Sequence, residues 1–259
     1  MYLEMQRSGM RFMKLNQIDL SIVIPAYCEE KRIGKTLDKL AVFLKHDRTF
    51  KHKEVEVIAV AANTPDRTRE IILSKKHLFK QFKIIKPQSK VGKGRDVQLG
   101  IMHASGKIIV FMDADLATPL HYLDKFYEIC SGDYDVVIGT RNLLKYRPNF
   151  IRRLFAIVGN ILFRIVSGIW IEDSQCGFKM FKRAAARKCF SKLTILGWGF
   201  DMEVLAIARA NHLGIKYYRI NDWKDKPGST FTDGLIKTSI HSLRDLIHIK
   251  IKLSKNSYS

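Results

Sequence analysis

Hydrophobic positions along the first 140 residues alternate between two spacings. Short apolar runs rich in β-branched residues predict buried strands at 20–26, 54–61, 82–85, 107–112 and 135–138. Between them, apolar residues that recur on one helical face predict helices at 30–45, from Pro65 through 72, at 94–104 and at 119–130. The first of these helices carries Ile33, Leu37, Leu40 and Leu44 at helical spacing.

Strands that alternate with helices are typical of α/β proteins, in which a mainly parallel sheet is flanked by helices. In such sheets, ligands bind beyond the carboxyl ends of the strands. Residues suited to chemistry follow the predicted strands: Glu29, Asp66, Asp113 with Asp115, and Arg141. We therefore expect a binding site along that edge of the sheet.

The segment 150–170 predicts an amphipathic helix of unusual composition. The surface of this helix is apolar except for a narrow stripe formed by Arg153, Asn160, Arg164 and Ser167. Such a helix either lies in a membrane interface or is buried with its arginines lining the active site. No stretch is apolar enough to predict a transmembrane helix, because Asn160 and Arg164 interrupt the best one.

A second helical pattern occupies the C-terminal segment 231–259, in which lysine and arginine lie among apolar residues. This segment docks either on the rest of the protein or on anionic lipid. Each cation near an anionic membrane contributes about 1 kcal/mol, so a cluster has a substantial effect. We expect a peripheral protein held by amphipathic helices and charge.

Charge changes this picture more than composition does. The chain of 259 residues has 45 lysines and arginines against 25 acidic residues, a net charge of +20. Such a surface attracts nucleic acid, anionic membranes or phosphate-bearing substrates, and charge alone does not choose among them. The four cysteines form no C-x-x-C pair, and the N-terminus lacks the apolar core of a signal peptide. Both features favour a reduced, cytosolic setting.

The strongest candidate for chemistry is Asp113-Ala114-Asp115, which follows the strand at 107–112. A turn at a strand end can bring both carboxylates toward one ligand. Paired carboxylates beside phosphates suit Mg²⁺ or Mn²⁺, which prefer oxygen ligands. Alternatively, Asp115 caps the helix that follows Pro119.

Several motifs in order resemble glycosyltransferase family 2 of the GT-A fold, a Rossmann-like α/β architecture. They are IVIPAY at 22–27 followed by Glu29 and Glu30, GKG at 92–94, and FMDADLATP at 111–119. GTR at 139–141, DSQCGFK at 173–179 and GWGFDME at 197–203 are similar to the dolichyl- or polyprenyl-phosphate sugar transferase branch. Within it, the dolichyl-phosphate glucosyltransferase-like members show the resemblance most clearly.

The resemblance implies roles for matching residues. Those that would line the nucleotide site are Pro25, Ala26, Tyr27, Glu29 and Lys93. Asp113 would serve the donor sugar and the metal, with Asp115 the more direct metal ligand.

On the acceptor side of the site, the sequence leaves alternatives for the role of Asp201 and for the cation that binds the acceptor. Asp201 occupies the position of a catalytic base in many relatives, although it could equally cap its own helix. A phosphate acceptor is largely ionised at neutral pH and needs no base. It does need cations, and Arg141 is the first candidate, ahead of Arg152, Arg153 and Lys179.

Two departures from the family affect the nucleotide site. Relatives carry an acidic turn after the second strand, where this chain has Ala61 and Ala62, and Cys28 replaces the usual asparagine. The identity of the donor is therefore open.

These observations predict an N-terminal extension at 1–19, a catalytic domain at 20–230 that includes the helix at 150–170, and a C-terminal amphipathic helix and tail at 231–259. The expected activity is inverting, metal-dependent transfer of a sugar to polyprenyl or dolichyl phosphate on the cytoplasmic face of a membrane. UDP-glucose is the first expected donor and GDP-mannose the second. An integral membrane protein is a possible further partner.

Three other functions remain open on sequence grounds. The first is transfer to a soluble saccharide with Asp201 as base, and the second is a non-catalytic role with a degraded nucleotide site. The third is nucleic-acid binding, which only the charge suggests. Aromatic and basic residues form no stacking pattern for nucleic acid, so no nucleic-acid partner is expected.

Overall fold

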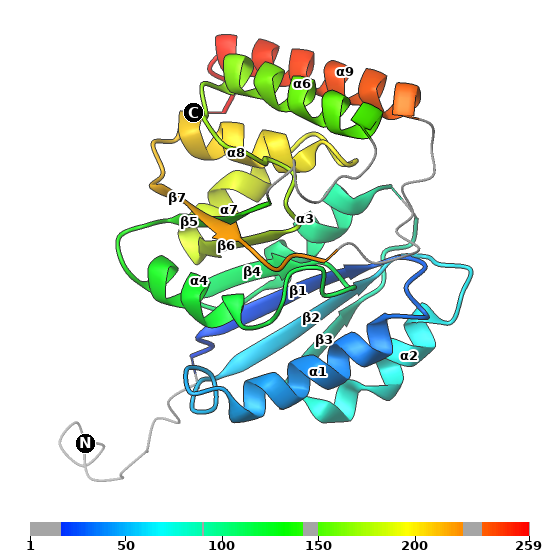
Figure 1. The fold of residues 1–259 in the computed structure, drawn as a ribbon. Helices are drawn as coiled ribbons and strands as arrows, with labels where there is room; N and C mark the ends of the chain where they lie inside the picture. Colours follow the sequence, from blue (N-terminus) through cyan, green and yellow to red (C-terminus); the bar gives the residue numbers. More distant parts are fainter. Residues whose placement is uncertain (1–16, 90, 142–149, 225–234, 259) are drawn as a thin grey trace, which may run out of the picture.

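A single seven-stranded sheet forms the centre of the computed structural model, which describes residues 17–89, 91–141, 150–224 and 235–258 (Figure 1). The strands follow the order β3-β2-β1-β4-β6-β5-β7 across the sheet. Their bounds are β1 Leu20–Ala26, β2 Val55–Ala61, β3 Gln81–Ile85, β4 Ile108–Met112, β5 Val136–Arg141, β6 Phe178–Lys182 and β7 Ile215–Ile220.

All strands except β6 run parallel to one another. β6 lies antiparallel between β4 and β5, with Val110 opposite Met180 and Val137 opposite Met180 on the other side. The prediction of a mainly parallel sheet is thus confirmed. β6 and β7 were not predicted, and they complete the half of the sheet that carries Arg141.

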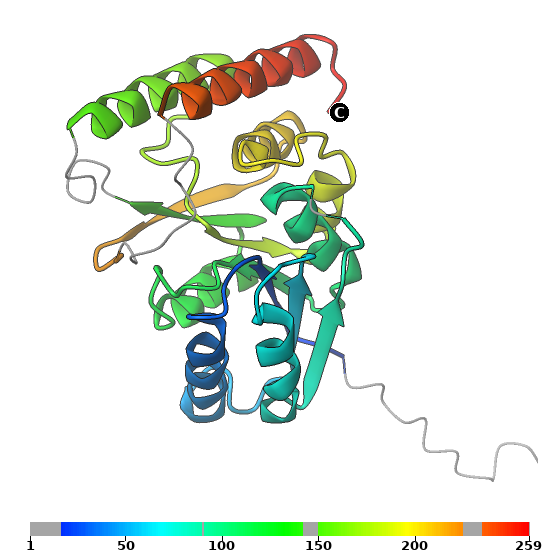
Figure 2. The same cartoon turned by 90° about the vertical axis from the view of Figure 1, so that its right-hand side faces the viewer.

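Helices cover both faces of the sheet (Figures 1 and 2). On one face α1, α2 and α4 enclose a core with alternate residues of β1, namely Leu20, Ile22 and Ile24. Val23 points to the opposite core, which α3, α7 and α8 cover. The helix bounds are α1 Ile33–His46, α2 Thr68–Ser74, the 3₁₀ helix η1 Lys76–Leu78, α3 Lys93–His103, α4 Tyr122–Ser131, α6 Phe150–Ser167, α7 Arg183–Ser191, α8 Phe200–Ala210 and α9 Leu235–Ser254.

The predicted elements differ from the structure mainly at helix starts. α2 begins at Thr68 rather than Pro65 because Asp66 forms a turn first: its carboxylate accepts hydrogen bonds from the Thr64 hydroxyl and the Thr68 amide. α4 likewise begins at Tyr122, not at Pro119. Most of the extension predicted at 1–19 lies outside the described residues.

α6 and α9 lie side by side and form an outer layer over α8 (Figures 1 and 2). Two residues of the polar stripe of α6 face the protein: Asn160 Nδ2 donates to Ile171 O at 2.9 Å, and Arg164 Nε donates to the same oxygen at 2.8 Å. These hydrogen bonds fix the loop that follows α6. Over the described residues, no helix is long and apolar enough to cross a membrane.

Candidate active site

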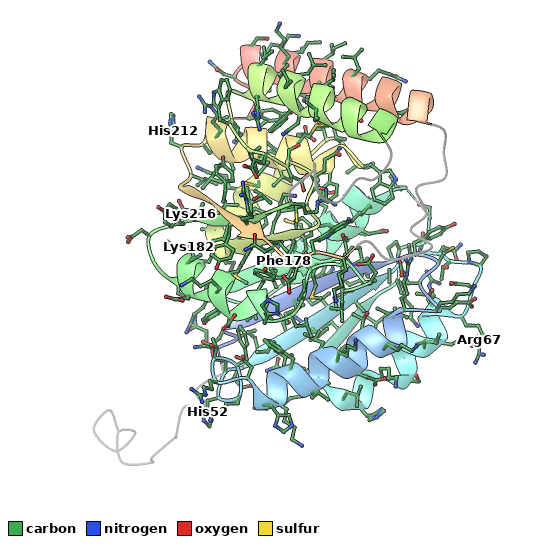
Figure 3. The ribbon with its side chains drawn as sticks, viewed as in Figure 1. His52, Arg67, Phe178, Lys182, His212 and Lys216 are labelled. Atoms are coloured by element: carbon green, nitrogen blue, oxygen red, sulfur yellow. The ribbon has the colours of Figure 1, made fainter. Side chains whose placement is uncertain are left out.

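The candidate site lies at the carboxyl edge of the sheet, where the loops after β1, β2 and β4 meet the end of β5. Arg67, at the start of α2, marks this edge in Figure 3, and His52 marks the opposite end of the same strands. Parallel strands bring their carboxyl ends to one edge, so residues far apart in sequence gather there.

The loops after β1 and β2 are joined by hydrogen bonds. The amides of Cys28, Glu29 and Glu30 donate to the side chains of Thr64, Thr68 and Asp66 at 3.1, 2.8 and 3.2 Å. Burial alone would raise the pKa of Asp66, but hydrogen bonds from Thr64, Thr68 and the Glu30 amide hold it below its usual range. Asp66 thus joins the loop after β1 to the loop after β2.

Pro25, Ala26 and Tyr27, which were predicted to line a nucleotide site, lie at the end of β1, with Ala26 buried. Cys28 follows in the left-handed region with φ 54°. Glycine and asparagine adopt this conformation more readily than cysteine does. The loop after β1 therefore has local backbone strain at Cys28.

Lys93 begins α3, and its Nζ lies 2.5 Å from Asp113 Oδ1. Burial would lower the pKa of Lys93, but the charges of Asp113 and Asp201 raise it above its usual value, so the ammonium stays charged. Space is tight around the pair, because a Cβ on Gly177 would lie 2.0 Å from Asp113 Oδ2. Glycine at that position allows the approach of β6 to Asp113.

Asp115 lies beside Asp113 in the loop after β4. Its Oδ1 accepts a hydrogen bond from the Ala117 amide at 2.9 Å, whereas α4 begins several residues later at Tyr122. Asp115 is therefore not the cap of α4. Burial, and next the negative charge of Asp113, raise the pKa of Asp115. Two such carboxylates repel each other, and a nearby cation would relieve that repulsion.

Oxygen ligands of this kind fit a divalent metal such as Mg²⁺ or Mn²⁺. Among the described residues, no group of three or more His, Cys, Asp or Glu side chains is arranged to hold a metal ion. A metal at Asp113 and Asp115 would therefore need further oxygens from the substrate or from water.

Arg32, which was not predicted as a site residue, lies close enough to Asp115 for its charge to act on that carboxylate. Its Nε and Nη2 donate to the two Glu29 oxygens at 2.6 and 2.9 Å, while its buried Nη1 has no hydrogen-bond partner among the described residues. The sequence did contain a signal for this pair, because Glu29 and Arg32 have opposite charges and are three positions apart at the start of a helix. Burial raises the pKa of Glu29, against the opposing effect of Arg32.

Arg141 ends β5 and is held by Asp173. Nη2 donates to Asp173 Oδ1 at 3.1 Å, Nε pairs with the other oxygen, and the guanidinium lies 5.0 Å from the centre of the Trp223 ring. Burial would raise the pKa of Asp173, but the charge of Arg141 lowers it, so the pair is ionised. Neither Asp173 nor Trp223 was predicted as a site residue.

Asp201 lies in the first turn of α8, whose N-cap is Gly199, so it does not cap that helix. Its Oδ1 forms an ion pair with Lys179 Nζ, which also donates to Cys176 O at 2.6 Å. Lys179 is fully buried and thus engaged within the protein. The side chains of Arg152 and Arg153, the other weaker candidates, lie outside the described residues.

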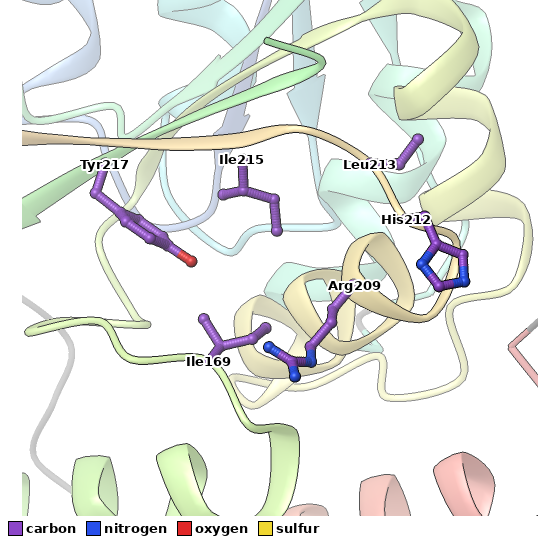
Figure 4. A pocket seen from close by; sticks show the side chains of 6 residues that line it. All are labelled: Ile169, Arg209, His212, Leu213, Ile215 and Tyr217. Atoms are coloured by element: carbon purple, nitrogen blue, oxygen red, sulfur yellow. The ribbon is translucent and has the colours of Figure 1, made fainter.

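One pocket lies away from this edge (Figure 4). Ile169, Arg209, His212, Leu213, Ile215 and Tyr217 line it. Ile215 is the first residue of β7 and pairs with Val136, the first of β5, whereas Arg141 is the last of β5. The pocket is therefore at the opposite end of these strands from the candidate site.

Comparison with known proteins agrees with this geometry. Dolichyl-phosphate beta-glucosyltransferases of Trichomonas vaginalis and Saccharomyces cerevisiae are 29% and 33% identical to this chain. The alignments cover 92% and 91% of this chain and 76% and 75% of those proteins.

A solved structure shares the fold at lower identity. Glucosyl-3-phosphoglycerate synthase from Mycobacterium tuberculosis, crystallised with Mn²⁺, UDP-glucose and phosphoglyceric acid, matches with a TM-score of 0.63 and 16% identity. The match covers 90% of this chain and 80% of that one. The glycosyl transferase family 2 profile matches residues 21–190, from β1 through α7. The chain therefore belongs to glycosyl transferase family 2.

Proposed function

We propose that this protein transfers glucose from UDP-glucose to dolichyl or another polyprenyl phosphate, with inversion at the anomeric carbon. The observation that carries the proposal is the convergence of two held cations, Lys93 and Arg141, with the carboxylates Asp113 and Asp115 at one edge of the sheet. The relatives' names supply the acceptor and the β-glucosyl product.

In this reaction, an acceptor phosphate oxygen forms a bond to the anomeric carbon of glucose. The bond from that carbon to the diphosphate oxygen breaks, and the leaving UDP takes the electron pair. Arg141, oriented by Asp173 and Trp223, would hold the acceptor phosphate near the donor. Lys93 would contact the donor diphosphate once it separates from Asp113.

Asp115, with Asp113, would hold Mg²⁺ or Mn²⁺ together with diphosphate oxygens. When bound, the metal neutralises charge that develops on the leaving diphosphate. Glu29, Pro25, Ala26 and Tyr27 would line the nucleotide beside it.

Asp201 supports a phosphate acceptor rather than a saccharide acceptor. A saccharide hydroxyl must lose a proton to a base, whereas a phosphate is already largely ionised. The Asp201 carboxylate is paired with Lys179, which competes with the role of a general base. We therefore assign Asp201 to positioning the charged groups of the site.

The outer layer of α6 and α9 would bind the membrane, on the cytoplasmic side. Both helices expose large apolar side chains, and the loop after α6 adds another. These residues are Val158, Ile161, Leu162, Ile165, Trp170, Leu243, Ile247 and Ile251. We call this set the outer apolar face. Because Asn160 and Arg164 turn inward, α6 can present apolar residues to lipid. The net charge of +20 adds attraction to anionic headgroups.

A transfer assay tests the activity. The protein is incubated with dolichyl phosphate, Mn²⁺ and radiolabelled UDP-glucose, with GDP-mannose in parallel, and label in the organic phase is counted. We expect metal-dependent label from UDP-glucose that is lost in Asp115→Ala. Label from GDP-mannose alone would refute the donor, and label only in soluble saccharides would refute the lipid acceptor.

A further inference from the structure

Asp96 is a buried carboxylate in the first turn of α3. It is 6% exposed, and its Oδ1 has no hydrogen-bond partner among the described residues. The neighbouring Arg95 directs its Nη1 to Gln98 Oε1 at 2.8 Å. Burial raises the pKa of Asp96 to about 6. Buried polar groups are normally paired, so an unpaired one suggests a missing ligand.

The packing of α3 locates Asp96 relative to the sheet. One turn later on the same face, Gly100 lies so close to the strands that a Cβ there would be 2.3 Å from Val23 Cγ1 and 3.0 Å from Val60 Cγ2. α3 connects the parallel strands β3 and β4, so it runs against the strand direction. One turn back along α3, about 5.4 Å, therefore leads toward the carboxyl ends of β1 and β2.

Ala62, the residue directly after β2, occupies the matching place beside the sheet. Ile58 and Val60 point into the core beneath α3, and Ala62 follows two residues later, about 6.6 Å further along extended backbone. The chain is still extended beside β1 there, since the Ala62 amide donates to Ala26 O at 3.3 Å. Asp96 and Ala62 are thus on the same face of the sheet, toward the edge that carries the candidate nucleotide site.

The two positions are complementary in chemistry. The turn after β2 provides no carboxylate at Ala61 or Ala62, while α3 provides a buried carboxylate at Asp96 whose Oδ1 has no partner among the described residues. We propose that Asp96 accepts a hydrogen bond from the imide N–H of the donor's uracil base, in place of an acidic residue after β2. This inference rests on the proposed function, in which the site binds a uridine nucleotide.

The test compares two ligands on three proteins. Binding of UDP and of 3-methyl-UDP, which lacks the imide N–H, is measured by calorimetry with Mn²⁺ on wild type, Asp96→Ala and Asp96→Ala with Ala62→Asp. Wild type should bind 3-methyl-UDP about ten-fold more weakly than UDP, as expected for loss of a charged hydrogen bond. Asp96→Ala should bind both ligands alike, and Ala62→Asp should restore the preference.

Asp124→Ala is the matched control, because Asp124 also lies in the first turn of a helix, α4, and its carboxylate accepts from the Lys125 amide. It should keep the wild-type preference for UDP. An equal preference in wild type and Asp96→Ala, with UDP bound, would overturn the role of Asp96 and leave the proposed function standing. Failure of wild type to bind UDP at all would overturn both.

Discussion

Lys179 and Asp201 form an ion pair in the protein interior, 22 positions apart in sequence. Lys179 lies in β6 and Asp201 in the first turn of α8, so the pair joins the sheet to the helix layer beneath the candidate site. Burial raises the pKa of Asp201, against the opposing charges of Lys179 and Lys93.

Removing one partner of this pair should destabilise the fold. Lys179→Met leaves the Asp201 charge buried and uncompensated, and the free energy of unfolding should fall by about 3–5 kcal/mol. Lys179→Met with Asp201→Asn removes both charges and should recover most of the loss. Urea unfolding of wild type, Lys179→Met, Asp201→Asn and the double variant measures this coupling; equal losses in Lys179→Met and the double variant would show that the ion pair is not the cause.

The Lys93–Asp113 pair leads to a prediction about catalysis. Lys93→Met keeps the length of the side chain but removes its charge from the donor diphosphate, so kcat/KM for UDP-glucose should fall about 100-fold. Steady-state transfer rates measure the change. Lys188, an exposed lysine on α7, provides the matched control, and Lys188→Met should retain wild-type rates. A wild-type kcat/KM in Lys93→Met would remove Lys93 from the donor site.

Asp96 makes stability depend on pH in a defined direction. Its pKa is about 6 in the folded protein against 3.8 as its ordinary value, so the folded state favours the protonated form. The ionised form therefore destabilises the fold above about pH 6, and this cost disappears as the pH falls toward 4. Asp96→Asn should stabilise the protein at pH 8 by at most about 3 kcal/mol.

Thermal melting of wild type and Asp96→Asn at pH 8 and pH 4.5 tests this sign. The variant should melt higher at pH 8, and the gap should shrink at pH 4.5. A gap that is constant across pH would mean that Asp96 ionisation does not limit stability.

The outer apolar face predicts where the protein meets lipid. Ile165→Asp places a charge at an α6 position that is 73% exposed, and binding to anionic vesicles should fall about ten-fold or more, because transfer of an isoleucine side chain alone contributes about 1.5–3 kcal/mol. Vesicle co-sedimentation measures it. The control is Val42→Asp on α1, which is 61% exposed but distant from α6 in the fold. Equal loss in both variants would show that the face has no special role.

Local pattern was enough to predict the first five strands and the edge where the site forms. β1 was predicted with its bounds as found, because an apolar run that is buried on both faces carries its own signal. Asp113 and Asp115 could be located for the same reason, since they directly follow such a run in β4. β6 and β7 were missed: β6 carries two lysines among its five residues, and its Lys179 is nevertheless buried.

The sequence by itself determined the α/β class, the position of the candidate site residues at the carboxyl ends of strands, and the presence of a polar stripe on α6, because these depend on spacing within single elements. Only the tertiary structure decided the partners: Asp173 for Arg141, Lys179 for Asp201, and Ile171 O for the α6 stripe. A helical period shows that a stripe exists but not which way it faces. Pairing depends on register and packing between segments distant in sequence, and no local pattern carries that information.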